Sequence, residues 1–340
     1  MDKVLTISHR TRRKAVVGLV AATIFASFGA VTALTLGRPV EITVANALLI
    51  GTAVGLFEEF YVHSERGNWM RNMHPLRSIP VYVGVIVIIY LASTHITHAL
   101  LGRLDDLPTV YRRLPYGLAV FTLFSLVGVS MMRIIHFVGL ETLFHLLVGT
   151  YHRPVQEQKV LLFLDVNDST ALGVALGPLA IRALMRKFLA DVSQPIIDFG
   201  GDIYLYKGDG LIATWNWAAA MRHKAVLSTV DAMFQAIERD RAVYERLWGR
   251  VPSFRVGIHG GAVVVSEQGD AKRSIGIYGD TINIAARMEE AAKTRNVCCI
   301  VSNVLADAIG YCDRLRPIGE ETVKGISGPV RICEYQPRHS

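Results

Sequence analysis

Four uncharged apolar stretches fill most of the first 132 residues of this 340-residue chain, and they constrain its first half more than any other feature. None of the four contains Asp, Glu, Lys or Arg; they are Ala15–Leu36, Ile42–Phe57, Ser78–Gly102 and Leu114–Met132. A helix needs about 20 apolar residues to cross a bilayer. We therefore predict four membrane-spanning helices, with buried soluble helices as the alternative.

The predicted spans cover residues 15–36, 42–62, 78–102 and 114–135. The second span extends past Glu58 and Glu59, which we expect at the membrane interface. Near the outer end of the third span, His95 and His98 are three residues apart. Polar groups inside a span are costly and often functional. These histidines could bind a metal or haem, or they could be satisfied by headgroups and helix neighbours.

The distribution of basic residues predicts the orientation of the spans. Five precede the first span, three lie between the second and third, and three follow the fourth. Because basic residues favour the cytoplasmic side, we expect both termini and the soluble half in the cytoplasm, anchored in the lipid of the cell (inner) membrane. The net charge of +7 partly reflects this bias. No basic stripe with interleaved aromatics occurs in the soluble half, so we do not expect nucleic-acid binding.

The chain divides into three predicted parts. Residues 1–137 form the transmembrane domain, 138–155 a coupling helix and linker in which Pro154 breaks the helix, and 156–340 a soluble domain. Four cysteines occur in the soluble domain without metal-ligand spacing. We expect them to be reduced thiols.

The soluble domain alternates between strand and helix patterns. We expect one long helix from the segment after Val166 to about Phe199, and another over Ala218–Leu247. The expected strands are Val160–Val166, Ile203–Tyr206, Leu211–Trp215, Phe254–Val265, Ser274–Tyr278, Cys299–Ser302 and a final pair near Glu321–Tyr335. With a helix at Thr281–Ala292, the order is β-α-β-β-α-β with additions. This order predicts an α/β fold of the ferredoxin-like class.

Two isolated carboxylates mark the ends of strand-like runs. Asp165 follows the apolar run Val160–Leu164, and Asp209 lies in a tight turn between Gly208 and Gly210. Neighbouring strands could bring both into one cation shell, and oxygen ligands suit Mg²⁺ or Mn²⁺ with substrate phosphates completing the coordination. The backbone amides of Asn167–Thr170 could hold phosphate oxygens at a helix start. Taken singly, such residues are usually a helix cap and a turn.

A third element lies on the helix predicted after Gly279. Asn283 and Arg287 are four residues apart and share one helix face. Asn283 can hydrogen-bond a sugar hydroxyl, and Arg287 can meet charge that develops on phosphorus. Lys324 is a further candidate phosphate contact. The alternative for each is an ordinary solvated surface residue.

Together these motifs resemble the catalytic domain of class III nucleotidyl cyclases. The segment 163–170 looks like the first metal motif of that family, and Gly200–Asp209 looks like the second. Gly257–Gly261 resembles the strand that follows, and Gly279–Met288 the Asn/Arg helix. The four motifs occur in the family's order and span nearly the whole soluble half. The coupling segment before Pro154 is also similar to that of membrane-linked members.

The resemblance implies conversion of ATP to 3′,5′-cyclic AMP and pyrophosphate at a homodimer interface. Two metal ions per site would be held by Asp165, Asp209 and the carbonyl of Val166. Asn283 and Arg287 would act from the other chain, on the ribose and the transition state. The resemblance also implies a set of substrate contacts, namely Asn167, Asp168, Ser169, Thr170, Gly208 and Lys324.

Two positions depart from the family pattern. The family often has a Lys four residues before the second metal Asp, where this chain has Leu205, and an Asp or Thr where it has Gly276. Neither side chain can hydrogen-bond a base, and base discrimination depends on such contacts. We favour ATP, with a guanylate cyclase or a catalytically silent regulatory module as the alternatives. The signal that the membrane half receives is not identified by the sequence.

Overall fold

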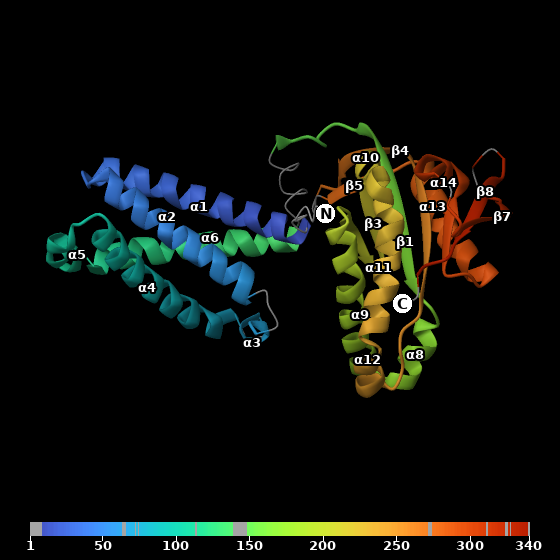
Figure 1. Cartoon of the computed structure of the whole chain (residues 1–340), viewed down its shortest axis with the longest axis horizontal. Coiled ribbons are helices and arrows are strands. Elements are labelled where there is room, and N and C mark those ends of the chain that lie inside the picture. Colours follow the sequence, from blue (N-terminus) through green and yellow to red (C-terminus); the bar gives the residue numbers. More distant parts are fainter. Residues whose placement is uncertain are drawn as a thin grey trace, which may run out of the picture. The chain divides into compact units, whose positions relative to one another are not determined.

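The computed structural model describes residues 9–62, 66–71, 73, 75–112, 114–138, 148–270, 274–310, 312–323, 326 and 328–338. The chain forms two compact units, Met1–Phe144 and His145–Ser340 (Figure 1). The second unit contains the predicted soluble domain. Half of the segment 138–155, predicted as a coupling helix and linker, falls on residues 139–147, which lie outside the described part of the chain.

The first unit is helical, and a long helix coincides with each of the four apolar stretches. Its elements are α1 (His9–Leu36), α2 (Val40–Leu56), η1 (Phe57–Val62), α3 (Asn68–Arg71), α4 (Pro75–Leu100), η2 (Leu104–Asp106), α5 (Leu107–Arg112) and α6 (Leu114–Val138). Within the described residues, two helical segments are long and apolar enough to cross a membrane, Val40–Val62 and Pro80–Leu100. Two shorter apolar segments are Ala22–Thr35 and Pro115–Gly128. The four-span arrangement remains a prediction.

Glu58, expected at the membrane interface, forms a hydrogen bond with another helix of this unit. Its side chain is buried, with 1% of the residue exposed, and it accepts a hydrogen bond of 3.1 Å from the Tyr82 hydroxyl of α4. The π-helical turn η1 contains Glu58 in the continuation of α2. Burial of a polar group costs free energy unless a partner is present, and Tyr82 supplies one.

The two histidines of α4 are satisfied by their own helix. His95 Nδ1 donates to the carbonyl of Leu91, and His98 Nδ1 donates to the carbonyl of Thr94, both at 2.8 Å. The second nitrogen of His95, Nε2, is 2.5 Å from the hydroxyl of Tyr111. No cluster of three metal-ligating side chains occurs among the residues with described positions. These contacts are the helix neighbours of the second interpretation, and they use Nδ1 of each ring.

The second unit is built around one mixed sheet with the strand order β2-β3-β1-β4-β6-β8-β7, and β5 pairs with β4. The strands are β1 (Val155–Val166), β2 (Asp202–Lys207), β3 (Gly210–Asn216), β4 (Phe254–Gln268), β5 (Ser274–Tyr278), β6 (Cys299–Ser302), β7 (Leu315–Glu321) and β8 (Val330–Tyr335). The first four strands pair antiparallel in the order expected of a ferredoxin-like unit. The remaining strands extend it, beginning with β6, which pairs parallel to β4. The predicted mixed α/β fold is therefore confirmed.

Two helices predicted for this unit are each divided into shorter ones. The helices of the unit are α8 (Ser169–Leu176), α9 (Pro178–Asp198), α10 (Trp217–Met221), η3 (Arg222–Lys224), α11 (Ala225–Arg239), α12 (Arg241–Trp248), α13 (Asp280–Arg295) and α14 (Asn303–Ile309). The long helix expected up to Phe199 is broken at Gly177, whose φ of 79° leaves the helical region just before Pro178. The helix expected over Ala218–Leu247 is interrupted by positive φ angles at His223 and Lys224. Both single-helix predictions are wrong.

The side chains of β1 alternate between two hydrophobic cores. Val160, Leu162 and Leu164 pack in the core that contains α9 and α11, whereas Leu161 packs with Ala285 of α13. Figure 1 shows α9 and α11 lying together over the sheet. Because successive side chains of a strand point to opposite faces, Asp165 belongs to the α13 face. The register of the sheet therefore decides which residues can meet Asp165.

Candidate active site

Asp165 and Asp209 lie at the same end of neighbouring strands. Asp165 is the last residue but one of β1, and Asp209 lies in the β2–β3 turn, where Gly208 has a φ of 64°. Leu164 of β1 pairs with Leu211 of β3. A Cβ placed on Gly210 would lie 2.2 Å from the carbonyl oxygen of Leu164, so only a glycine allows this approach. The two carboxylates are thus brought to one end of neighbouring strands.

The electrostatics of Asp165 reflect this neighbour. Burial raises the pKa of its carboxyl group above the usual value, and the negative charge of Asp209 raises it further. The positive charges of Arg255 and Lys293 act in the opposite direction. A cation placed between the two carboxylates would relieve their repulsion.

The donor set at this point fits a hard divalent cation. Two carboxylates supply charged oxygens, and Val166, 1% exposed, adds a backbone carbonyl at the end of β1. The described residues contain no cluster of three or more acidic, His or Cys side chains around them. Mg²⁺ is commonly held by one or two carboxylates plus substrate phosphates. The site therefore suits a metal that arrives with, or is completed by, a phosphorylated substrate.

Arg255 is a member of this site that the sequence analysis missed. It lies directly across from Asp165 in the β1–β4 ladder, and its guanidinium donates to Asp165 Oδ2 at 2.5 Å. The same group donates to Asn167 Oδ1 at 2.6 Å and to Glu289 Oε1 at 2.5 Å. Only 9% of the Arg255 side chain is exposed. The sequence did contain one signal for this role, because Arg255 is a charged residue inside the predicted apolar strand Phe254–Val265.

The predicted phosphate loop is only partly open. The backbone N–H of Asn167 donates to the carbonyl of Ser253 at 2.9 Å, and its side-chain Nδ2 donates to the Ser253 hydroxyl at 3.1 Å. Asn167 therefore has no free backbone N–H for a phosphate, contrary to expectation. Ser169 and Thr170 begin α8, where the first amides have no acceptor within the helix. These two amides remain candidates for anion binding.

Asp168 precedes α8 but does not cap it. Its backbone is left-handed, with φ of 51°, and its side chain makes no capping hydrogen bond within the described structure. An N-cap residue normally has extended φ and ψ, with its side chain turned back to the helix amides. The left-handed backbone at Asp168 prevents this geometry.

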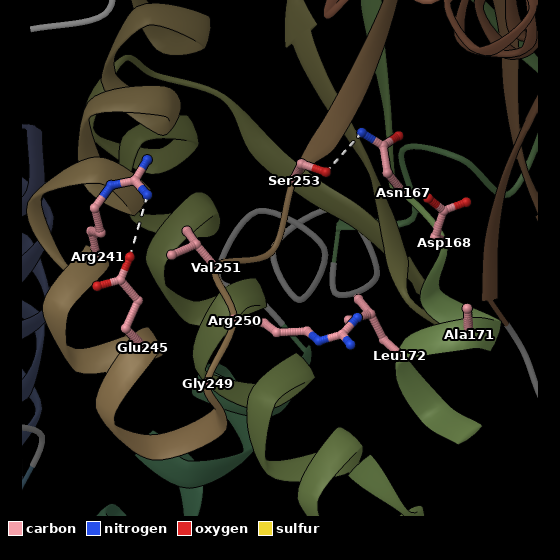
Figure 2. Close-up of a pocket in the computed structure, with 10 residues that line it drawn as sticks. All are labelled: Asn167, Asp168, Ala171, Leu172, Arg241, Glu245, Gly249, Arg250, Val251 and Ser253. Atoms are coloured by element: carbon pink, nitrogen blue, oxygen red, sulfur yellow. Dashed lines mark hydrogen bonds and ion pairs between the residues drawn. The ribbon is translucent and has the colours of Figure 1, made fainter. Parts of the chain in front are cut away.

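A pocket of about 550 Å³ opens beside this loop (Figure 2). Its lining residues are Asn167, Asp168, Ala171, Leu172, Arg241, Glu245, Gly249, Arg250, Val251 and Ser253. Figure 2 shows the Arg250 side chain reaching across the pocket toward Leu172, while Arg241 is held by Glu245. Of the predicted site residues, this pocket contains Asn167 and Asp168 but neither Asp165 nor Asp209.

Asn283 and Arg287 occupy the exposed side of α13. Asn283 is exposed, and Arg287, 42% exposed, forms an ion pair with Glu290 one turn further on. The opposite side of α13 packs on β4, where a Cβ on Gly257 would lie 2.0 Å from the backbone N of Glu289. The predicted shared face of Asn283 and Arg287 is thus available to another molecule. Lys324 lies outside the described residues.

The two positions expected to contact the base provide no polar side chain. Leu205, on β2, is 48% exposed. At Gly276 of β5, a Cβ would lie 2.5 Å from the hydroxyl oxygen of Tyr278, so the tyrosine ring covers this position. Neither position therefore offers a side chain that could hydrogen-bond a base, in agreement with the sequence analysis.

Comparison with known proteins identifies the class of this fold and site. The family model for the adenylate and guanylate cyclase catalytic domain matches residues 152–331. The chain belongs to this family, and its second unit is a nucleotidyl cyclase catalytic domain.

The more specific likenesses are to bacterial adenylate cyclases. The chain is 34% identical over 205 residues to adenylate cyclase 2 of Rhizobium meliloti (strain 1021), covering 58% of this chain and 55% of that protein. It is 26% identical over 185 residues to adenylate cyclase 1 of the same strain, covering 53% of this chain and 27% of that protein. The chain thus spans about half, or less, of these relatives' lengths.

A solved structure shows the same fold. The structure of a bacterial light-regulated adenylyl cyclase superposes with a TM-score of 0.55 at 15% identity, covering 64% of each chain. At this identity the likeness concerns the fold alone. It agrees with the ferredoxin-like sheet described above.

Proposed function

We propose that this protein is a membrane-anchored adenylate cyclase that converts ATP to 3′,5′-cyclic AMP and pyrophosphate in signal transduction. The observation that carries the proposal is the pair Asp165 and Asp209, brought together at the ends of neighbouring strands. The 34% identity with an adenylate cyclase of Rhizobium meliloti supports the choice of reaction and of ATP.

The reaction exchanges one bond to the α-phosphorus for another. The 3′ oxygen of the ribose bonds to the α-phosphorus, the bond to the bridging oxygen breaks, pyrophosphate leaves and the hydroxyl proton is released. Asp165, Asp209 and the carbonyl of Val166 would hold two Mg²⁺ or Mn²⁺ ions per site. When bound, these ions favour the deprotonated hydroxyl and neutralise the triphosphate.

The remaining site residues orient the substrate. Asn283 would hydrogen-bond the ribose, and Arg287 would donate to the oxygens that gain charge in the transition state. The amides of Ser169 and Thr170 suit phosphate oxygens at the start of α8. Gly208, with its left-handed backbone, forms the turn beside Asp209, and Asp168 and Lys324 complete the proposed substrate contacts.

A homodimer with two equivalent sites accounts for the separation of these groups. The charges that act on Asp165 are those of Asp209, Arg255 and Lys293, whereas the Arg287 side chain is 42% exposed and paired with Glu290. We infer that Arg287 and Asn283 serve the metal residues of a second chain. A closed two-fold interface would then build two sites from one sequence.

Guanylate cyclase activity is the second candidate, because Leu205 and Gly276 offer no hydrogen bond to either base. The apolar helices Val40–Val62 and Pro80–Leu100 support membrane anchoring. We propose four spans with the catalytic domain and both termini in the cytoplasm. The membrane part, 1–137, would hold two chains together and could receive a signal, through a linker at 138–155, for the catalytic domain at 156–340.

A direct assay tests the proposal. The full chain is purified in detergent and incubated with Mn²⁺ or Mg²⁺ and either ATP or GTP, and cyclic nucleotide and pyrophosphate are both quantified. We expect cyclic AMP and pyrophosphate in equal amounts, with less product from GTP. If the wild-type chain makes no more product than Asp165→Ala with either nucleotide, the protein is not a cyclase. More product from GTP than from ATP would make it a guanylate cyclase.

A further inference from the structure

Three charged side chains, Asp165, Arg255 and Glu289, form a bonded series. They connect the proposed metal half of the site, Asp165 and Asp209, to helix α13. Arg255 bonds Asp165 on one side and Glu289 on the other, both at 2.5 Å. Glu289 lies two residues after Arg287 on α13. One chain therefore contains a direct polar connection from its metal carboxylate to the helix that carries its Asn283 and Arg287.

The connection is rigid because its parts are fixed by the fold. Asp165 and Arg255 are partners in the β1–β4 ladder, so their side chains share the α13 face. Gly257, two residues after Arg255, brings the backbone of α13 against β4 at Glu289. Arg255 and Glu289 are 9% and 19% exposed in their side chains. Loss of one partner from such a buried ion pair is far more costly than loss of a surface pair.

We infer that Glu289 is a positioning residue that, through Arg255, couples the two half-sites carried by one chain. In the proposed homodimer, Asp165 of a chain serves one site and α13 of that chain serves the other. A change at Asp165 would thus be transmitted by Arg255 and Glu289 to α13, and so to the second site. This inference rests on the proposed function only for its last step, since the connection itself lies within one chain.

Hydrogen exchange tests the connection without any turnover. Asp165→Asn and Asp209→Asn each remove one metal carboxylate, but only Asp165→Asn also removes the charged partner of Arg255. In the full-length protein we expect amides of residues 285–292 to exchange about tenfold faster in Asp165→Asn and in Glu289→Gln. Asp209→Asn should exchange like the wild type there. Unchanged exchange in both Asp165→Asn and Glu289→Gln, or equally faster exchange in Asp209→Asn, would overturn the inference.

Mixed dimers test the effect on the sites. One chain carries Arg287→Ala and the other Asp209→Ala, so the single intact site takes its metal residues from the first and its helix residues from the second. Glu289→Gln is added to either chain in turn, and Arg295→Gln, which loosens the tie of α13 to β7, is the matched control. We expect a loss of about tenfold in kcat for Glu289→Gln in either chain and little change for Arg295→Gln.

The outcomes separate the two proposals. An effect of Glu289→Gln confined to the chain that supplies Arg287 would mean a local role in α13, and the coupling would be wrong while the cyclase stands. An effect of Arg295→Gln equal to that of Glu289→Gln would also overturn the coupling. If the mixed dimers are inactive while wild-type dimers make cyclic AMP, the shared site fails, and the exchange experiment still decides whether the connection exists.

Discussion

The proposed metal half of the site, Asp165 and Asp209, and the proposed helix half, Asn283 and Arg287, differ in how far one chain completes them. Asp165 lies in the sheet, two-thirds covered, with Arg255 bonded to it and Asp209 beside it. Asn283 and Arg287 lie on the outside of α13, and Arg287 has a surface partner, Glu290. The first half is organised by the fold of a single chain, whereas the second half would act, in the proposed homodimer, on a substrate bound to the metal residues of a second chain.

This difference has an energetic basis. Neighbouring carboxylates at the end of two strands repel each other, and the fold keeps them together because Gly210 allows a close approach and Arg255 compensates part of the charge. The surface pair of Arg287 and Glu290 contributes little to stability. Arg287 can therefore leave Glu290 for a phosphate at low cost, and the metal carboxylates cannot rearrange as easily.

The largest effect is expected from the metal half. Asp165→Ala or Asp209→Ala should lower kcat by about a thousandfold, because each removes a ligand of the ions that stabilise the reacting phosphate. Cyclic AMP formation at saturating Mn²⁺ measures this. Asp313→Ala, in the connection between α14 and β7, is a control for loss of an acidic residue. Activity within about threefold of wild type for either site variant would contradict the assignment.

Substitution of Arg287 in the helix half should have a smaller effect on kcat and no effect on metal binding. Arg287→Ala should lower kcat by about a hundredfold, the scale for one lost donor to the transition state. Arg287→Lys should recover little, because a single ammonium does not replace the planar guanidinium. Mn²⁺ titration of the purified variant, followed by the relaxation of water protons, should match wild type. A weakened Mn²⁺ affinity would place Arg287 in the metal half instead.

The stability of the catalytic domain should fall in acid because of His259 of β4. His259 of β4 is buried beside Ser302, and burial lowers its pKa to about 4 from 6.5. The unfolded chain binds a proton near pH 6.5 and the folded chain only near pH 4, so stability is full above pH 6.5 and falls between these values, by about 3 kcal/mol.

Urea unfolding between pH 4 and 7 checks this fall in the free energy of unfolding. His259→Asn should reduce the pH dependence of the free energy of unfolding. Substitution of the exposed His152 by Gln should leave that dependence unchanged. An unchanged slope in His259→Asn would show that other groups cause the acid sensitivity.

The smallest effect should come from the base-reading position. Leu205→Lys adds a donor that can meet the N1 acceptor of adenine but not the N1–H of guanine. We expect the ratio of kcat/KM for ATP over GTP to rise by about tenfold. Leu205→Glu should shift the ratio toward GTP. Leu247→Lys, at another exposed leucine on α12, is the control and should leave the ratio unchanged. No shift in either Leu205 variant would remove this residue from the base site.

Local patterns in the sequence were sufficient for much of this description. The apolar run before Asp165 predicted a buried strand, and Ser274–Tyr278 and Cys299–Ser302 are strands with the predicted bounds. The glycines around Asp209 predicted its turn. These features depend on residues that are close in the sequence, where periodicity and turn chemistry decide the structure.

Features that depend on distant residues were missed. Arg255 and Asp165 are 90 residues apart, and their contact follows from the β1–β4 register, which the sequence does not state. Burial of Glu58 depends on Tyr82 of another helix. The loss of the Asn167 amide to Ser253 likewise depends on a neighbouring segment. Each of these contacts depends on the tertiary arrangement more than on local preference.

The division of the site between two chains is tested most directly by mixing inactive variants. Asp209→Ala and Arg287→Ala chains are co-expressed with different tags, the mixed dimers are isolated by both tags, and cyclic AMP formation is compared with each homodimer. Because one intact site can form in the mixed dimer, we predict activity near half of the wild-type value per dimer, with both homodimers nearly inactive. Mixed dimers as inactive as the two homodimers would show that each chain uses its own Arg287, and the account of two half-sites would be wrong.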